Sequence, residues 1–520
     1  MTTKTYLCGA FLLTLGLLTG CGEKFLEEAP ADQVTDVNFY QTQTDALQAV
    51  TAAYSELGKE GQYNLALWNM DIASDISVSG GDDGNDAVEF KQIEAASIPT
   101  TNKVANRLWG GCFVGIQRAN LVLQKVPGIK NIDPAVQRRC LGEAQFLRAK
   151  YYFDLVRTFG DVPLFTAPPA GPAAVNIPRT PAAAVYKQIE DDLVQAIGNL
   201  DGSYSGDDLG RATKWSATGL LAKVYITEAS MGDASKKPLA AQRAREVINN
   251  SGKTMWASYG DNFKIENENN NAKESLFEAQ FVSGKNFENF GYTQNGPGFA
   301  GNEFFGPRGA NQTPGSGYGF NVPEPDFVNG YEAGDTRKAV TIWQPGDVYP
   351  DGKTQSGKAT GSPYGYNCRK WFIGKVNTAI WDSGLNIPVL RLAEMHLILA
   401  EALGASAEGF ENLNKVRRRA FGLPIGTASA RDLTAANTPD FTAAVLRERK
   451  YELAFEFDRW FDLKRYNGTQ YGLIPVLTAQ SAYLRTLNIQ RGVPTAKNLV
   501  LPIPQSELDA NPGLVQNPGY

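Results

Sequence analysis

The sequence contains a single histidine, His396, in 520 residues. A Ser-His-Asp triad, a Cys-His dyad or a histidine-based zinc site would each depend on this one imidazole, so its scarcity disfavours these catalytic classes. His396 lies within a strongly helical, apolar stretch, Leu392 to Ala402. We therefore expect it to be buried in a core or groove. Carboxylate chemistry is not excluded by this argument.

Cysteine is also scarce, and no two cysteines form a C-x-x-C pair. The spacing of a zinc or redox site is therefore missing, and we expect neither a metal nor another cofactor. Cys8 and Cys21 belong to the N-terminal segment, which leaves Cys112, Cys140 and Cys368 for the folded part. Three cysteines allow at most one intramolecular disulfide, and we expect isolated core thiols.

The chain also lacks a marked excess of one charge, since 50 basic and 55 acidic residues give a formal net charge of −5. Without a basic excess to neutralise phosphates, nucleic acid is not expected as a partner. Apolar residues make up 42% and charged residues 20% of the chain, which excludes a disordered or polytopic membrane protein and predicts a globular one. The 52 glycines and 28 prolines predict much irregular surface, where binding sites tend to lie.

A targeting segment is predicted over residues 1–20. Lys4 supplies a positive charge, and Tyr6 to Leu18 form an apolar run that is too short to span a bilayer. The sequence that follows, Leu18-Thr19-Gly20-Cys21, resembles a bacterial lipobox. This resemblance implies cleavage before Cys21 and a diacylglycerol anchor on its thiol. Gly22 stands where aspartate would suggest the inner membrane, so we expect the outer membrane, with residues 21–40 as a lipidated, extended leader.

Most of the remaining chain carries apolar residues at helical spacing, which predicts a mainly α protein. Asp133-Pro134 has the N-cap and first-turn proline of a helix start, and Gly160 ends the apolar stripe that follows. Consecutive helices joined by turns resemble a tetratricopeptide-like scaffold of helical hairpins, although no strict repeat period is present. Helices are predicted over residues 44–57, 109–126, 133–160, 180–200, 215–229, 240–248, 389–403, 410–420 and 441–461.

The predicted organisation is a single domain over residues 41–520. A helical scaffold covers residues 41–264 and 387–465, and an irregular C-terminal segment covers residues 466–520. Between them, residues 265–386 form a loop-rich insertion with a few short strands, because glycine, asparagine, proline and aromatic residues dominate there. Such a long loop segment inside a compact domain is more often functional than idle.

The charged stretch Arg447 to Arg465 is the densest run of basic and acidic residues in this scaffold. Because leucine and aromatic residues alternate with the charges, we interpret it as a helix with ion pairs at three- and four-residue spacing. A charge run is usually a solvated face, so we assign it to the scaffold and not to a ligand site.

Candidate ligand-binding residues lie in two places. Sugar recognition needs flat apolar faces edged by amides and carboxylates, and the insertion supplies both. The loop Gly80 to Asp86 packs carboxylate and amide oxygens into a turn-forming segment, which we interpret as a solvated polar loop, a ligand contact or a calcium site. The candidates are Asp82, Asp83, Asn85, Tyr292, Phe305, Tyr318 and Trp343.

Several ordered segments across nearly the whole chain carry a family resemblance. The most distinctive are Glu143 to Ala149 with Phe159 to Leu164, and Arg447 to Glu456 with Arg459 to Arg465. Together with Leu501-Pro502-Ile503-Pro504, they resemble the SusD/RagB nutrient-binding lipoproteins of Bacteroidetes outer membranes. His396 stands where this family more usually has tyrosine, which affects a helix interior and no known site.

The resemblance implies a SusD-like fold that binds nutrients and does not transform them. It implies capture of a glycan, or in some cases a peptide, at the cell surface and delivery to a SusC-like TonB-dependent transporter of the outer membrane, as part of polysaccharide utilisation. Ligand contacts in the family come from the loop that corresponds to Ser79–Asp86 and from loops ahead of Pro323–Val328. The alternative, a surface-tethered glycosidase, would need two carboxylates at a fixed separation across a cleft, and no glycosidase motif is recognisable.

Overall fold

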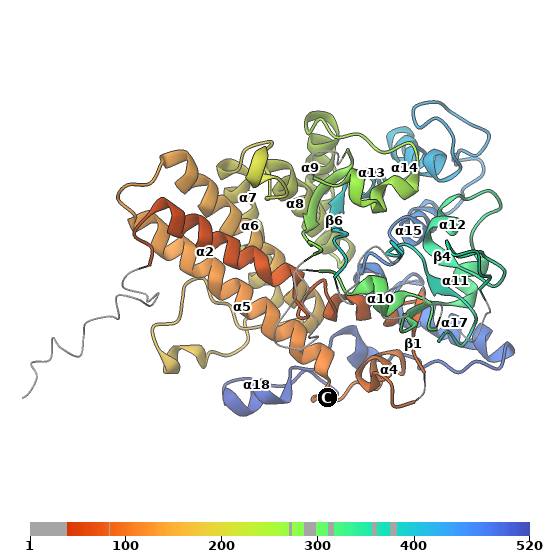
Figure 1. Cartoon of the computed structure of the whole chain (residues 1–520), viewed down its shortest axis with the longest axis horizontal. Helices are drawn as coiled ribbons and strands as arrows, with labels where there is room; N and C mark the ends of the chain where they lie inside the picture. The colour runs from red at the N-terminus through yellow and green to blue at the C-terminus, as the bar shows by residue number, and fades with distance from the viewer. Residues whose placement is uncertain are drawn as a thin grey trace, which may run out of the picture.

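The structure, a computed structural model, describes residues 39–520 except residues 83, 270–272, 285–297, 310–316, 356–360 and 375–381. Cys21 and the predicted targeting segment lie outside the described residues. Helices dominate the architecture, as predicted, and the chain passes from a block of long helices to a region of short helices and strands (Figure 1). Among the described residues, no helix has the length and apolar character needed to cross a membrane.

Helix α6 (Pro134–Phe159) shows how the sequence sets the scaffold. Asp133 is its N-cap, because its Oδ1 accepts a hydrogen bond from the backbone N–H of Ala135 at 2.7 Å. The helix ends at Gly160, whose φ of 75° favours glycine. Both predicted boundaries of this helix are confirmed. Nearly every side chain from Gly142 onward is buried, so α6 lies at the centre of the scaffold.

The long helices pack in chain order as hairpins, which confirms the tetratricopeptide-like prediction. Helix α6 packs against α5 and α7, α8 packs against α7 and α9, and α13 packs against α9 and α14. Helix α2 lies along α5 and α6 (Figure 1). Besides α6, these helices are α2 (Gln43–Ser55), α5 (Lys103–Lys125), α7 (Ala182–Asn199), α8 (Lys214–Ser230), α9 (Lys236–Asn250), α13 (Leu392–Leu403) and α14 (Ala407–Ala420).

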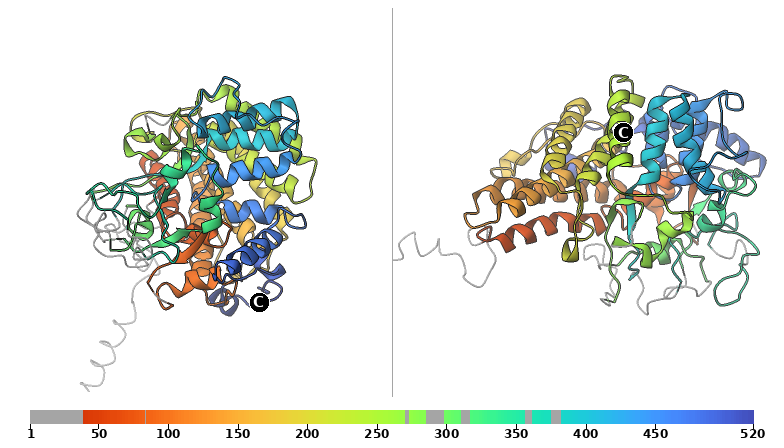
Figure 2. Two further views of the ribbon diagram at one scale, coloured as in Figure 1. Left: turned by 90° about the vertical axis from the view of Figure 1, so that its right-hand side faces the viewer. Right: turned by 90° about the horizontal axis from the view of Figure 1, so that it is seen from above.

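The strands form three small antiparallel pairs in the described part of the chain. They are β1 (Ser77–Gly80) with β3 (Phe320–Pro323), β2 (Ser275–Ala279) with β6 (Ile387–Arg391), and β4 (Ile342–Trp343) with β5 (Asn367–Cys368). Short helices lie among them: α3 (Asn69–Ile72), α4 (Val88–Glu94), α10 (Gly301–Phe305), α11 (Pro325–Asn329) and α12 (Arg337–Thr341). Figure 2 shows the described part of the insertion on one side of the helical scaffold in both views.

Several boundaries differ from the prediction, and three of the differences change the type or number of elements. Residues 387–391 form strand β6, so α13 begins at Leu392 and not at residue 389. The helix predicted over residues 441–461 is two helices, α15 (Phe441–Glu452) and α16 (Arg459–Arg465), because Phe455 and Phe457 between them adopt positive φ angles of 60° and 69°. The C-terminal segment expected to be irregular contains α17 (Leu473–Thr486) and α18 (Gln505–Ala510).

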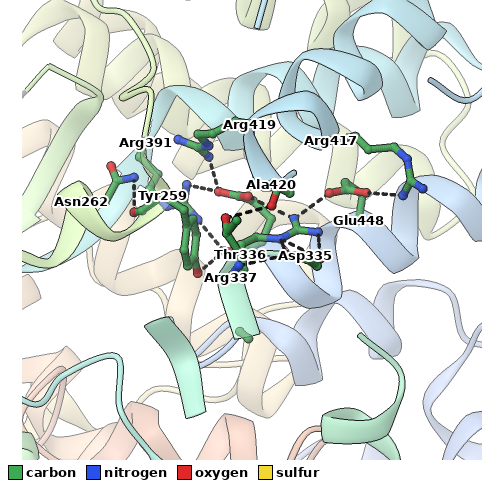
Figure 3. A network of polar contacts seen from close by, with 12 residues as sticks. Tyr259, Asn262, Asp335, Thr336, Arg337, Arg391, Arg417, Arg419, Ala420 and Glu448 are labelled. Carbon is green, nitrogen blue, oxygen red and sulfur yellow. Dashed lines mark hydrogen bonds and ion pairs between the residues drawn. The ribbon is translucent and has the colours of Figure 1, made fainter. Parts of the chain in front are cut away.

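Most charges of the run from Arg447 to Arg465 are buried, although Arg447 is exposed, and this corrects the prediction of a solvated face. Glu452 is fully buried and accepts hydrogen bonds from Arg391 and Arg419 at 2.5 Å each and from Arg337 at 3.2 Å. Figure 3 labels these three arginines within the polar network. Burial alone would raise the pKa of Glu452, but the three guanidinium charges lower it to about 2. The network therefore ties α15 to segments far away in the sequence and is not a set of neighbours on one helix.

His396 and the three cysteines are buried, as expected. His396 Nδ1 lies 2.7 Å from Asn412 Oδ1, and Asn412 donates its own amide to the Glu408 carbonyl at 2.8 Å. The neutral imidazole therefore carries its proton on Nδ1. Cys112, Cys140 and Cys368 are free thiols in the core, so they form no disulfide with one another.

Candidate functional site

Strand pairing brings the predicted acidic loop against the insertion. Gly80, at the end of β1, pairs with Phe320 of β3, and the Gly81 N–H donates to the Gly319 carbonyl at 2.9 Å. A Cβ atom at Gly80 would lie 2.1 Å from that carbonyl oxygen, so only glycine permits this approach. Residues 80–82, 84–87 and 317–320 therefore form one surface, here called the loop surface, although its two parts are far apart in the sequence.

Arg308 links the two halves of the loop surface. Its Nη2 atom donates to Asp86 Oδ2 at 2.5 Å, and its Nε–H donates to the Tyr318 carbonyl at 3.1 Å. Asp86 Oδ2 also accepts the Asp82 N–H at 2.9 Å, while the Asp82 carboxylate lies 3.9 Å from the Arg308 guanidinium and is 74% exposed. The loop thus presents an open carboxylate beside a fixed cation, and both are able to bond hydroxyl groups.

An aromatic stack supports the same surface. The Tyr318 ring is half-buried and lies nearly parallel to Phe304, with centroids 5.4 Å apart and an interplanar angle of 26°. Phe320 lies behind them, 6.4 Å from Tyr318 at an angle of 5°. Burial raises the pKa of the Tyr318 hydroxyl, and the nearby Glu303 charge adds to the effect, so the hydroxyl is neutral and can donate. Tyr318 is therefore a rigid, partly exposed ring.

Two predicted ligand residues lie in the core and not on a ligand surface. Phe305 is 1% exposed and packs edge-on against Trp68, with ring centroids 4.6 Å apart. Trp343 is 2% exposed, and the Arg369 guanidinium lies 4.0 Å from its ring centroid. The prediction is corrected for both, because a buried ring offers no face to a sugar. Aromatic composition alone could not separate exposed rings from rings packed beneath the loops.

Of the other four predicted ligand residues, the structure describes two. Asp82 and Asn85 are exposed in the loop beside Tyr318, and their ligand role stays a prediction. Asp83 and Tyr292 lie outside the described residues. Arg308 was not among the predicted residues, because its role depends on the β1–β3 pairing and no local motif marks it. Within the described residues there is no group of three or more histidine, cysteine, aspartate or glutamate side chains arranged to hold a metal ion.

Models of known protein families match both the N-terminal and the C-terminal part of the chain. Residues 273–520 match the model of the SusD family, and residues 24–226 match a SusD-like model described as starch-binding and associating with the outer membrane. The chain belongs to the SusD family. A curated SusD-like protein of Formosa agariphila is 28% identical to this SusD-family chain over 545 aligned positions, covering 96% of each protein.

Solved structures support the same assignment for this SusD-family protein. A laminarin-binding SusD-like protein is 30% identical, with a TM-score of 0.75, and the match covers 92% of this chain and all of that chain. Surface glycan-binding protein A from Bacteroides fluxus is 25% identical, with a TM-score of 0.76 and the same two coverages. The described helical scaffold is thus the SusD fold.

Proposed function

We propose that this protein is a surface nutrient-binding lipoprotein that captures glycan and passes it to a SusC-like TonB-dependent transporter of the outer membrane. It works as a binding protein and not as an enzyme. Family membership and the names of relatives that bind laminarin or surface glycans support this proposal. The outer-membrane description of the matched family model supports the location, and Cys21 supplies the lipid anchor.

The observation that carries the binding proposal is the geometry around Tyr318. Sugar rings pack their C–H faces on aromatic rings, and Tyr318 is held in place by Phe304 on one side. Arg308 and Asp82 stand at its border as donor and acceptor for hydroxyl groups. The loop surface thus combines a flat apolar face with fixed polar partners, which is the pattern that carbohydrate recognition needs.

The test is calorimetric titration of the purified protein with laminarin and starch, alongside a panel of short peptides. Tyr318→Ala should weaken glycan binding by about 1 kcal/mol, roughly a fivefold rise in Kd. Tyr483→Ala is the matched control, because Tyr483 is an exposed tyrosine, 40% accessible, on α17 outside the loop surface. It should bind as the wild type does. Binding of peptides but of no glycan would replace the proposed ligand class, and equal effects of both variants would move the site elsewhere.

The absence of catalysis is tested with the same protein. Asp86 is engaged by Arg308, so it serves the structure of the loop surface and is not poised as a free acid or base. Incubation with laminarin and starch should release no new reducing ends. Steady release that disappears in Asp82→Asn would instead favour the glycosidase alternative.

The transporter partner is tested by extraction from the native organism. A lipid anchor raises the effective concentration of the protein at its transporter, so a modest intrinsic affinity suffices. Pull-down in mild detergents should recover a large outer-membrane transporter together with this chain. Recovery only of the free monomer in several detergents would contradict this part of the proposal.

A further inference from the structure

A cavity lies in the helical scaffold, apart from the loop surface. It has a volume of about 250 Å3 and lies between the loop that joins α7 to α8, the segment after α9, and β2. All of its lining residues fall between Gly202 and Gln280, whereas the loop surface is made of residues 80–82, 84–87 and 317–320. In Figure 1, α8 and β1 are clearly separated, so the two surfaces are distinct.

Two aromatic side chains line this scaffold cavity. Trp215, in the first turn of α8, is half-buried, and Lys214 Nζ lies 5.2 Å from its ring centroid. The Tyr204 hydroxyl accepts the Asp201 N–H at 3.2 Å, and the Arg139 guanidinium lies 5.6 Å from the Tyr204 ring centroid. These contacts restrain both rings. The cavity therefore has an aromatic wall.

A carboxylate and a carboxamide of the lining are held by one shared partner. Glu278 on β2 is 8% exposed, and its Oε2 accepts from Asn386 Nδ2 at 2.9 Å. The same amide donates to Gln280 Oε1 at 3.1 Å, while Asn386 Oδ1 accepts the Phe281 N–H at 2.8 Å. Asn386 thus fixes both polar groups in the cavity before any ligand arrives.

Lys253 adds a positive charge to the same lining. Burial lowers the pKa of Lys253 and raises the pKa of Glu278, whereas the charge of each residue favours the ionised form of the other. Both charges have lost part of their hydration. A ligand with several hydroxyl groups would compensate for this loss, because a hydroxyl donates to a carboxylate and accepts from an ammonium group.

Two glycines let the loop before α8 close over the cavity. Gly210 has a φ of +85°, and a Cβ atom there would lie 2.7 Å from the Gln280 amide. A Cβ atom at Gly202 would lie 3.2 Å from Trp215 Nε1. Backbone therefore lies directly against the carboxamide and the indole, so the shape of the cavity is built into the fold.

We infer that the scaffold cavity is a second ligand site that takes one sugar ring or another cyclic polyol. The Trp215 indole offers a face for the C–H groups of the ring, and Glu278 and Lys253 offer partners for its hydroxyls. The volume of about 250 Å3 is below the roughly 300–1,000 Å3 of sites for drug-sized ligands, so it suits one ring and not a chain. The site goes beyond the proposed function, because it is independent of the loop surface and requires no polysaccharide.

Saturation-transfer NMR of the full chain tests this site, with glucose, galactose, mannose, N-acetylglucosamine and myo-inositol each added alone. At least one of these probes should bind at concentrations up to about 10 mM. Glu278→Gln keeps the size of the side chain but removes its charge, and Trp215→Leu removes the aromatic face. Each should weaken binding roughly tenfold. Thermal melts and near-UV circular dichroism check that the variants are folded.

Two further variants serve as a control and as a replacement in case one variant does not fold. Tyr483→Ala, an exposed tyrosine outside both sites, should leave binding unchanged. If Trp215→Leu unfolds, Lys253→Met takes its place and should also weaken binding. The inference is overturned if no probe binds, if binding survives Glu278→Gln together with the second variant, or if Tyr318→Ala abolishes it and so assigns the probe to the loop surface.

Discussion

Arg459 donates hydrogen bonds to both carboxylate oxygens of Asp75, which lies 384 positions earlier in the sequence. The Nε–Oδ1 and Nη2–Oδ2 distances are 2.7 and 3.0 Å. Lys450 adds a third contact, 2.9 Å from Asp75 Oδ2. Burial acts to raise the pKa of Asp75, but the Arg459 and Lys450 charges lower it well below its usual range. Asp75 is therefore a buried carboxylate that stays ionised and joins the first part of the chain to α16.

Removing the charge of Asp75 should destabilise the fold strongly. Asp75→Asn leaves the buried Arg459 and the partly buried Lys450 without their counter-ion, which costs about 3–5 kcal/mol of unfolding free energy. The control is Asp191→Asn, because Asp191 pairs with Lys187 on the exposed side of α7 and should contribute less than about 1 kcal/mol. Urea unfolding followed by circular dichroism measures both. Equal midpoints for the two variants would contradict the prediction.

The single imidazole gives a direct test of burial. Burial lowers the pKa of His396 to about 4, although its hydrogen bond with Asn412 acts in the opposite direction. An unfolded chain binds the proton at a pKa near 6.5, so the folded state loses stability as the pH falls from about 6.5 to about 4. The loss amounts to about 3 kcal/mol at most, and it is complete below the folded pKa.

The measurement needs only 13C-labelled histidine, because one residue gives the whole signal. We expect the ring resonances to stay constant from pH 8 down to about 5. The His396→Gln variant should lack the part of the pH-dependent loss of stability that comes from the imidazole. A titration midpoint near 6.5 in the folded protein would show that His396 is hydrated and that the predicted burial is wrong.

Trp343 should behave as a core residue and not as a ligand contact. Trp343→Ala removes a buried ring that packs against Tyr349, with centroids 5.0 Å apart, and should cost about 3–5 kcal/mol of stability. Tyr318→Ala, at a half-buried ring, should change thermal stability much less. Melting curves of both variants with titration of laminarin separate the two roles. A stable Trp343→Ala protein with weakened binding would return Trp343 to the ligand site.

Cys21 should be required for anchoring the protein in the membrane. A lipid anchor needs the thiol, so Cys21→Ala should give an uncleaved or soluble form in place of a membrane-bound one. Cys140→Ala, which removes a buried core thiol, is the matched control and should remain in the membrane fraction. Fractionation and mass spectrometry of the processed N-terminus measure both. Full membrane retention of a processed Cys21→Ala chain would refute the lipobox interpretation.

Local signals in the sequence predicted the parts of the fold that depend on local chemistry. Asp133 and Gly160 mark the ends of α6 because capping and positive φ are properties of single residues. Strand β6 was missed, since its five residues pair with β2 more than a hundred positions earlier and carry the same apolar pattern as the helix that follows. Tertiary context decided this boundary, as it decided the break between α15 and α16.

The candidate site was predictable as a region and not as a set of residues. The loop with Asp82 and the ring of Tyr318 do lie together, but the cation between them, Arg308, has no local signature. Phe305 and Trp343 have the same residue types as a sugar platform, yet they are buried. Exposure depends on how the loops fold over one another, and composition does not encode it.

The ion pair between Asp75 and Arg459 also affects when the chain can fold during its synthesis. A polypeptide made from its N-terminus presents Asp75 long before Arg459 exists, since 384 positions separate them. Until α15 and α16 are made, that carboxylate has neither Lys450 nor Arg459 beside it and stays hydrated, which opposes closure of the surrounding core. We therefore expect chains that end before α15 to be more open to proteases than the finished molecule.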